Sequence, residues 1–146
     1  MPPEVLSVSA LICQTSLLEQ DGVSSAIRIV DVFYVSEAPN AKVAFSAIVL
    51  VKSKAGFSSE RRARARIRTP SSHTIELTPE GVPVRLQSRL GDPSIPGGAT
   101  LTFQVVLEAE EMGVYWLKVF LDDDEVANLP FALKRPEPPT ERAPEH

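Results

Sequence analysis

The chain has 146 residues, of which 43% are hydrophobic and 23% charged, and its formal net charge is −4. These values are typical of one soluble globular domain with a sizeable core. The net negative charge argues against a dedicated nucleic-acid binder, although it is compatible with a local basic surface.

Apolar residues recur with a period of two along most of the chain, which predicts strands rather than helices. Residues 42–52 are apolar on both faces, as in a central strand, and residues 99–108 alternate cleanly apart from Val106. Residues 14–20 could form one helical turn. In chain order, the predicted strands are residues 5–13, 25–35, 42–52, 61–68, 73–78, 82–88, 99–108, 113–122 and 125–134.

Strands of this length, separated by turns rich in proline, glycine and aspartate, predict an all-β fold. We expect one domain, residues 1–134, built as an antiparallel immunoglobulin-like (Greek-key) β-sandwich of about 7–9 strands. Pro130 cannot donate to a ladder, so the last strand should lie at an edge or be bulged there. Residues 135–146 are rich in proline and glutamate, which predicts a disordered tail.

Cysteine usage and the N-terminus bear on the compartment. Cys13 is the one cysteine of the chain, so no intrachain disulfide can form, which favours a reducing compartment. The start, MPPEVLSVSALIC, has no basic region and carries Glu4, unlike a signal peptide. No run approaches the roughly 20 apolar residues of a membrane helix. We therefore expect a cytoplasmic protein without a membrane span.

The segment RARARIR, residues 62–68, alternates arginine with small or apolar residues. In a strand, one face would hold all four arginines and the opposite face would contact the core. We favour a solvated face that keeps the protein soluble and discourages edge pairing. The alternative is a binding face for an acidic protein, a phosphate-bearing ligand or nucleic acid, although the strand lacks stacking aromatic residues. The arginines concerned are Arg62, Arg64, Arg66 and Arg68.

Parity predicts how this strand pairs with the next one. Ile67 and Ile75 can both face the core only if odd-numbered residues oppose odd-numbered residues, which requires a connecting loop of about three or five residues. Glu76 then opposes Arg64 or Arg66. Such a cross-strand charge pair is worth roughly 0.2–1 kcal/mol.

The stretch EMGVYWL, residues 111–117, fits the pattern acidic-x-Gly-x-Tyr-x-apolar. It resembles the tyrosine corner of immunoglobulin-like domains, in which a tyrosine near the start of a strand bonds back to upstream backbone. Gly113 and Tyr115 match the motif, and Leu117 stands where an immunoglobulin domain carries its second cysteine. The resemblance implies a Greek-key sandwich held by packing instead of a disulfide, and it implies no ligand.

Trp116 belongs to the opposite face of this strand, together with Lys118. An indole beside a charged residue needs an explanation. We favour an indole covered by other parts of the chain. The alternative is an indole that anchors a partner, because tryptophan is enriched in interface hot spots.

Two longer segments, LICQTSLLEQDGVSSAIRIVDVFYV and GVYWLKVFLDDDEVANLPFAL, are similar to a family of small bacterial β-sandwich proteins of unknown function. The similarity spans most of residues 5–134. It implies a bacterial source and the sandwich fold, and no reaction. The residues that carry it are Cys13, Asp21, Gly22, Ser25, Ile27, Arg28, Val30, Asp31, Gly113, Tyr115, Trp116, Asp122 and Pro130.

Catalytic motifs are absent from the sequence. It has no zinc-binding Cys/His spacing, no phosphate-binding loop and no nucleophile elbow. Cys13 with His73 could form a dyad, but Cys13 ends an apolar strand, where a buried and unreactive thiol is the usual state. We therefore predict no enzymatic activity and no cofactor.

Three aspartates, Asp122, Asp123 and Asp124, form an acidic turn between two predicted strands. Loop carboxylates at the end of a sandwich can bind calcium, as in C2 domains, and Asp92 in another loop could join them. A solvated hairpin turn is the simpler interpretation, so we do not favour a metal site.

These observations favour a protein–protein interaction or assembly module that binds an unknown protein, through an edge strand or as a homodimer. Two alternatives stay open. One is polyanion binding through the four arginines, with nucleic acid the least expected ligand. The other is calcium-dependent, C2-like binding through the three aspartates.

Overall fold

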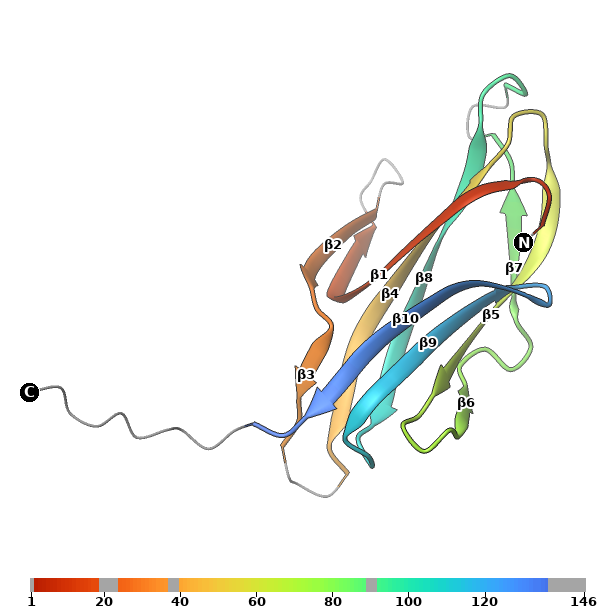
Figure 1. The fold of residues 1–146 in the computed structure, drawn as a ribbon. Helices are drawn as coiled ribbons and strands as arrows, with labels where there is room; N and C mark the ends of the chain where they lie inside the picture. The colour runs from red at the N-terminus through yellow and green to blue at the C-terminus, as the bar shows by residue number, and fades with distance from the viewer. Residues whose placement is uncertain (1, 19–23, 37–39, 89–91, 137–146) are drawn as a thin grey trace, which may run out of the picture.

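A computed structural model describes residues 2–18, 24–36, 40–88 and 92–136. The residues it describes contain no helix with the length and hydropathy needed to cross a bilayer. Asp21, Gly22 and the predicted tail from residue 137 onward lie outside the described residues. The described strands are β1 (Val5–Leu18), β2 (Ser24–Ile29), β3 (Val32–Tyr34), β4 (Lys42–Ser53), β5 (Ser59–Arg68), β6 (Thr74–Glu76), β7 (Val82–Leu86), β8 (Gly97–Glu108), β9 (Gly113–Leu121) and β10 (Asp124–Lys134) (Figure 1).

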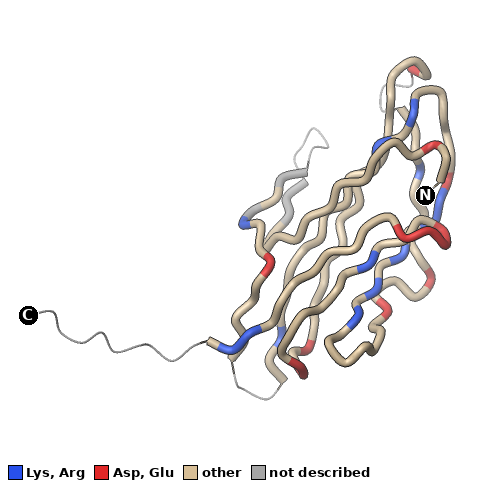
Figure 2. The backbone as a smooth tube through the Cα atoms, in the orientation of Figure 1, with Lys and Arg blue, Asp and Glu red and all other residues tan. Residues whose placement is uncertain are grey.

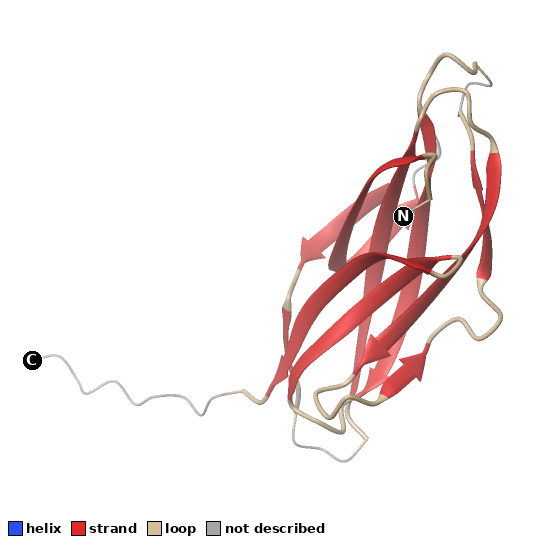
Figure 3. Ribbon diagram, turned by 45° about the vertical axis from the view of Figure 1, so that its right-hand side comes forward, coloured by secondary structure: helices blue, strands red, loops and turns tan. Residues whose placement is uncertain are grey.

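The strands form two sheets that enclose one hydrophobic core (Figure 3). Sheet A has the strand order β2-β1-β4-β8. Sheet B has the order β3-β10-β9-β5-β6, and β7 pairs with the first half of β5. Every pairing is antiparallel except that of β3 with β10. The prediction of an all-β, mainly antiparallel structure is therefore confirmed.

Two local predictions near the N-terminus are wrong. The helical turn is not formed at residues 14–18, because β1 continues there and pairs with β2. Residues 25–35 are not one strand: Arg28 has a φ of 56°, and β2 pairs with β1 whereas β3 pairs with β10. The chain therefore passes from sheet A to sheet B at Val30 and Asp31, which a single-strand prediction could not anticipate.

Pro130 lies in β10 opposite Trp116 of β9. On the side away from β9, β10 pairs with β3 only at residues 132–134. At Pro130, therefore, no described strand pairs with this side of β10. The predicted local edge at the proline is confirmed. The irregularity of β10 lies elsewhere, between Glu125 and Ala127.

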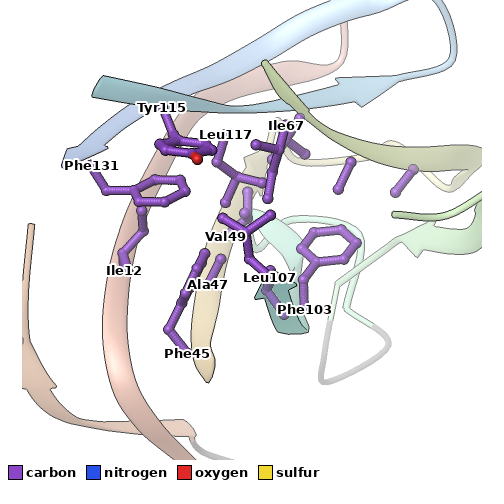
Figure 4. Packing of buried hydrophobic residues seen from close by; sticks show 14 of the residues in the cluster. Ile12, Phe45, Ala47, Val49, Ile67, Phe103, Leu107, Tyr115, Leu117 and Phe131 are labelled. Atoms are coloured by element: carbon purple, nitrogen blue, oxygen red, sulfur yellow. The ribbon is translucent and has the colours of Figure 1, made fainter. Parts of the chain in front are cut away.

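An aromatic cluster ties the two sheets together (Figure 4). Phe45 of β4 lies 5.0 Å from Phe131 of β10, measured between ring centroids, and Phe33 lies 5.3 Å from Phe45. Tyr115 of β9 stacks on Phe131 with a centroid separation of 5.4 Å. Ring pairs at these separations add to the free energy gained by burying their apolar area.

The hydrogen bond of a tyrosine corner is present at the start of β9. Tyr115 is 2% exposed, and its Oη donates to the carbonyl oxygen of Glu111 at 2.6 Å. Burial raises the pKa of Tyr115, and the bond to the Glu111 backbone opposes that rise only in part. Gly113 has a φ of 129°, a conformation that favours glycine. Leu117 is fully buried opposite Ile67. Apolar packing is therefore found at the position where an immunoglobulin domain carries a disulfide cysteine.

We expect Tyr115→Phe to lower the free energy of unfolding by about 1 kcal/mol, because it removes one hydrogen bond and keeps the ring stacking. Urea unfolding should show a lower midpoint with an unchanged slope. Tyr34→Phe is the matched control, since Tyr34 is 68% exposed and should tolerate the change. Equal midpoints for both variants would mean that the corner bond does not stabilise the fold.

Candidate functional site

The arginine stripe (Arg62, Arg64, Arg66 and Arg68) lies on the outer face of sheet B. The alternating residues Ala63, Ala65 and Ile67 are fully buried in the core, so the pleat directs the arginines outward. Basic positions follow one another along β5 in Figure 2. The predicted separation of a core face and an arginine face is confirmed for this strand.

The predicted register between β5 and β6 is also confirmed. Arg66 lies opposite Glu76, and the loop between the strands is residues 69–73. The Nε of Arg66 donates to Oε2 of Glu76 at 2.6 Å. Ile75, however, is 37% exposed, so the prediction that it shares the core is wrong. β6 has three residues, and no described strand lies beyond it to cover this side chain.

The other arginines of the stripe differ in how they are engaged. Arg62 donates from Nη1 to the carbonyl oxygen of Glu80 at 2.6 Å. Arg68 donates from Nη2 to Oγ of Ser72 at 3.2 Å. The side chain of Arg64 makes no hydrogen bond or ion pair with the residues that the structure describes, although its backbone belongs to the β5–β9 ladder. The stripe therefore retains donor capacity for an external acceptor.

Lys118 of β9 lies directly opposite Arg66, on the same outward face. Directly opposed like charges destabilise a pair of strands. Two carboxylates offset part of this repulsion: Glu76 beside Arg66, and Glu125, whose Oε1 lies 3.5 Å from Lys118 Nζ. A hollow of about 280 Å³, here called the basic hollow, lies at this point and is lined by Arg66, Ile67, Arg68, Thr74, Lys118 and Phe120.

Apolar side chains adjoin the basic hollow. Trp116 lies opposite Arg68 on one side and Pro130 on the other, and it is 37% exposed. Val114 is 48% exposed on the same face. Tyr34, which is 68% exposed, lies two strands away on β3, opposite Lys134 of β10. We call Tyr34, Val114, Trp116 and Pro130 the apolar patch. The favoured prediction of a covered indole is wrong for the described structure, because no described segment forms a layer over this face.

The acidic turn does not gather its carboxylates. Asp122 has a φ of 52°, and its carboxylate accepts hydrogen bonds from Arg61 Nη1 at 2.9 Å and from the Arg62 amide at 3.0 Å. Asp123 and Asp124 are exposed. Across the described ranges, no group of three or more His, Cys, Asp or Glu residues is placed to hold a metal ion.

The remaining candidates lie apart from one another. Asp92 accepts hydrogen bonds from the hydroxyl and the amide of Ser94, at 2.7 and 2.9 Å, and these bonds lower its pKa. Cys13 is fully buried in sheet A, whereas His73 lies in an exposed loop of sheet B near Ser71. The structure therefore brings no Cys–His dyad together.

An ion-pair network that the sequence pattern did not indicate surrounds Arg61, which precedes the stripe by one residue and shares the inward parity of Ala63. Its Nε donates to Oε1 of Glu4 at 2.6 Å, and it also bonds to Asp122. Glu4 is 2% exposed and accepts a further bond from Ser59 Oγ at 3.0 Å. The parity of residue 61 was the available signal, but it does not identify a partner so distant in sequence.

This network changes the acidity of both carboxylates. Burial acts to raise the pKa of Glu4, but hydrogen bonds from backbone, Ser59 and Arg61, with the charge of Arg61, bring it below the ordinary 4.5. Hydrogen bonds from Arg61 and from the Arg62 amide lower the pKa of Asp122 below 3.8. Both groups are therefore held ionised, and they tie the N-terminal segment and the β9–β10 turn to β5.

A second hollow, of about 290 Å³, lies where β4 ends and β8 begins. Its lining includes Leu50 and Ile95, and Lys52 is its one charged residue. Gly98 approaches β4 so closely that a Cβ there would lie 1.9 Å from the carbonyl oxygen of Val51. Thr100 and Lys52 are the polar side chains of this lining, and no histidine or carboxylate accompanies them there.

No protein-family model matches the chain, and no curated protein matches it. Among solved structures, it is similar to an immunoglobulin-like protein from Pseudomonas aeruginosa, with 15% identity, coverage of 90% of this chain and 97% of that one, and a TM-score of 0.35. A DNA-bound alkylpurine DNA glycosylase from Pseudomonas fluorescens has 12% identity, 71% and 27% coverage, and a TM-score of 0.42. A family 123 glycoside hydrolase from Clostridium perfringens has 8% identity, 88% and 27% coverage, and a TM-score of 0.41. The chain thus spans about a quarter of these two enzymes' length.

We expect Glu4→Gln to lower the free energy of unfolding at neutral pH by roughly 1.5–3 kcal/mol, the range for hydrogen bonds to a charged group. Because its folded pKa is lowered, Glu4 stabilises the fold fully above pH 4.5, and this contribution is lost as the pH falls through the lowered pKa. The variant should therefore lose less stability than the wild type on acidification.

Urea unfolding between pH 7 and pH 3 measures this difference. Glu60→Gln, a change at an exposed residue of β5, is the control and should follow the wild-type profile. Parallel acid profiles for wild type and Glu4→Gln would contradict the assignment of acid sensitivity to Glu4.

Proposed function

We propose that this protein is a non-enzymatic interaction module whose protein partner binds the outer face of sheet B. The supporting observation is the apolar patch directly beside the arginine stripe on one uncovered sheet face. Tryptophan, tyrosine and arginine are the residue types enriched in interface hot spots, and all three occur there. Within this proposal the fold is an immunoglobulin-like sandwich with Greek-key connections, and the compartment is the bacterial cytoplasm.

The chemistry of this face suggests the kind of partner. An apolar side chain of the partner would pack on Trp116 and Val114, and acidic side chains would face the stripe. Charges of this kind raise association rates and specificity more than affinity. Nucleic acid is less favoured, because the whole chain carries a net charge of −4.

We expect Val114→Lys to abolish partner binding, because it places a charge in the middle of the apolar patch. The measurement is affinity capture from a lysate of the source organism, with mass spectrometry, at low and high salt. Val106→Lys is the matched control: Val106 is 66% exposed, and lies on the outer face of sheet A.

A protein retained at high salt by the wild type and by Val106→Lys, but lost with Val114→Lys, supports the proposal. Nucleic acid recovered at low salt alone would contradict it and favour polyanion binding. Loss of the partner with Val106→Lys alone would move the binding surface to sheet A.

Assembly through β8 is the second candidate function. From Ala99 to Glu108, β8 pairs with β4 on one side, and no described strand pairs with it on the other. This edge is long and contains no proline or lysine, the usual protection against edge pairing. A second copy of the chain could add its own β8 in antiparallel fashion about a two-fold axis.

In this second case, we expect light scattering after size-exclusion chromatography to show wild-type dimers that dissociate on dilution. Val106→Lys should run at the monomer mass of 15.9 kDa, because a lysine on an edge strand opposes pairing with a second strand. Val114→Lys should behave like the wild type. A wild-type monomer at every concentration would exclude the assembly.

A further inference from the structure

We infer that the basic hollow receives a phosphoryl group carried by a side chain of the bound protein. This inference rests on the proposed function, since it assigns one chemical feature to the partner. The first supporting observation is the direct opposition of Arg66 and Lys118 across the β5–β9 seam. Such a pair reduces the stability of the sheet, and a bound anion would relieve the repulsion.

The two carboxylates near the hollow offset only part of the positive charge where β5 pairs with β9. Glu76 approaches Arg66 from β6, and Glu125 approaches Lys118 from β10. Both therefore come from strands that flank the seam rather than from β5 or β9 themselves. Arg64 and Arg68 lie diagonally across from Lys118 along β5, so the cations near this strand pairing outnumber the two carboxylates.

The local charge count favours a phosphoryl group over a single carboxylate. Three cations line the hollow, namely Arg66, Arg68 and Lys118, and Arg64 lies beside them on β5. Glu76 pairs with Arg66 and Glu125 pairs with Lys118, so two of these four cations have no carboxylate partner among the described residues. A phosphorylated side chain carries about −1.5 to −2 charges at pH 7 and has three strong acceptor oxygens. An aspartate or glutamate of the partner would neutralise only part of the excess.

The donors of the hollow are of the right type and are partly held in place. The guanidinium of Arg66 lies 5.2 Å from the centroid of the Phe120 ring and is held from its other side by Glu76. Arg68 has one hydrogen bond, to Ser72, so most of its five donors remain available. Arginine pairs with phosphoryl oxygens through two parallel bonds, and Thr74 adds a hydroxyl to the lining.

The hollow is a local feature of three strands. It has a volume of about 280 Å³ and is formed by six residues of β5, β6 and β9. A nucleic-acid backbone would need a continuous groove with several phosphate contacts. The adjoining apolar patch would then hold neighbouring side chains of the same partner, so that one phosphorylated segment contacts both features.

Trp116 gives a direct readout, because it is the one tryptophan of the chain and lies opposite Arg68 at the border of the hollow. The test titrates the full-length protein with three short, otherwise neutral peptides that carry phosphoserine, serine or aspartate at one position. Binding is followed by Trp116 fluorescence and by backbone amide chemical shifts. The variants are Lys118→Met and Arg68→Gln, with Arg85→Gln as the control, since Arg85 is an exposed arginine of β7 outside the hollow.

We expect the phosphoserine peptide to bind in the millimolar range, corresponding to about −4 kcal/mol. Amide shifts should concentrate at residues 66–68, 74, 118 and 120. Binding should weaken about tenfold in Lys118→Met and in Arg68→Gln, and stay unchanged in Arg85→Gln. Melting temperatures check folding, and Lys118→Met should be at least as stable as the wild type because it removes the opposed charge.

Equal binding of the phosphoserine and aspartate peptides, equal losses in Arg85→Gln, or no binding at all would each overturn the inference. These outcomes are separate from failure of the proposed function. Capture of a partner that is lost with Val114→Lys but unaffected by Lys118→Met and by phosphatase treatment would leave the interaction surface standing and remove the phosphoryl site.

Discussion

β5 and β9 pair so that Ala65 lies opposite Val119 and Ile67 lies opposite Leu117, and all four side chains are fully buried. A sheet allows one register to bury these residues, because a shift by one position would turn every side chain to the other face. The same register places Arg64, Arg66 and Arg68 opposite defined residues of β9. Core and surface therefore depend on a single strand pairing, and the surface contacts follow from the demands of the core.

This dependence explains why opposed cations persist at the seam. Burial of Ile67 and Leu117 contributes about 1.5–3 kcal/mol each, whereas the repulsion of an exposed like-charge pair costs well under 1 kcal/mol. The core therefore sets the register even where the surface residues repel one another. The pairing of β5 with β9 does not itself require a lysine opposite Arg66, although Lys118 gains an ion pair with Glu125. The proposed phosphoryl site would give this lysine a role.

Strand parity along the chain was sufficient to predict the arginine face, the pairing of Arg66 with Glu76 and the motif around Tyr115. These features depend on residues within about ten positions of each other or on the alternation of one strand. Parity did not predict the exposure of Trp116 or Ile75, because exposure depends on what lies beyond the strand. The role of Glu4 was missed for the same reason, as its partner Arg61 comes from a strand far along the chain.

Arg61 and Arg62 show how one position along a strand separates an inward ion-pair network from an outward charged face. Arg61 points inward, and its ion pairs with Glu4 and Asp122 join three distant segments of the chain. Arg62 and the arginines that follow it point outward, where exposed charge pairs contribute little to stability. Substitutions in the stripe should consequently alter binding without unfolding the protein, whereas substitution of Arg61 should do the reverse. In the proposed interaction module, the recognition surface could therefore change at little cost in stability.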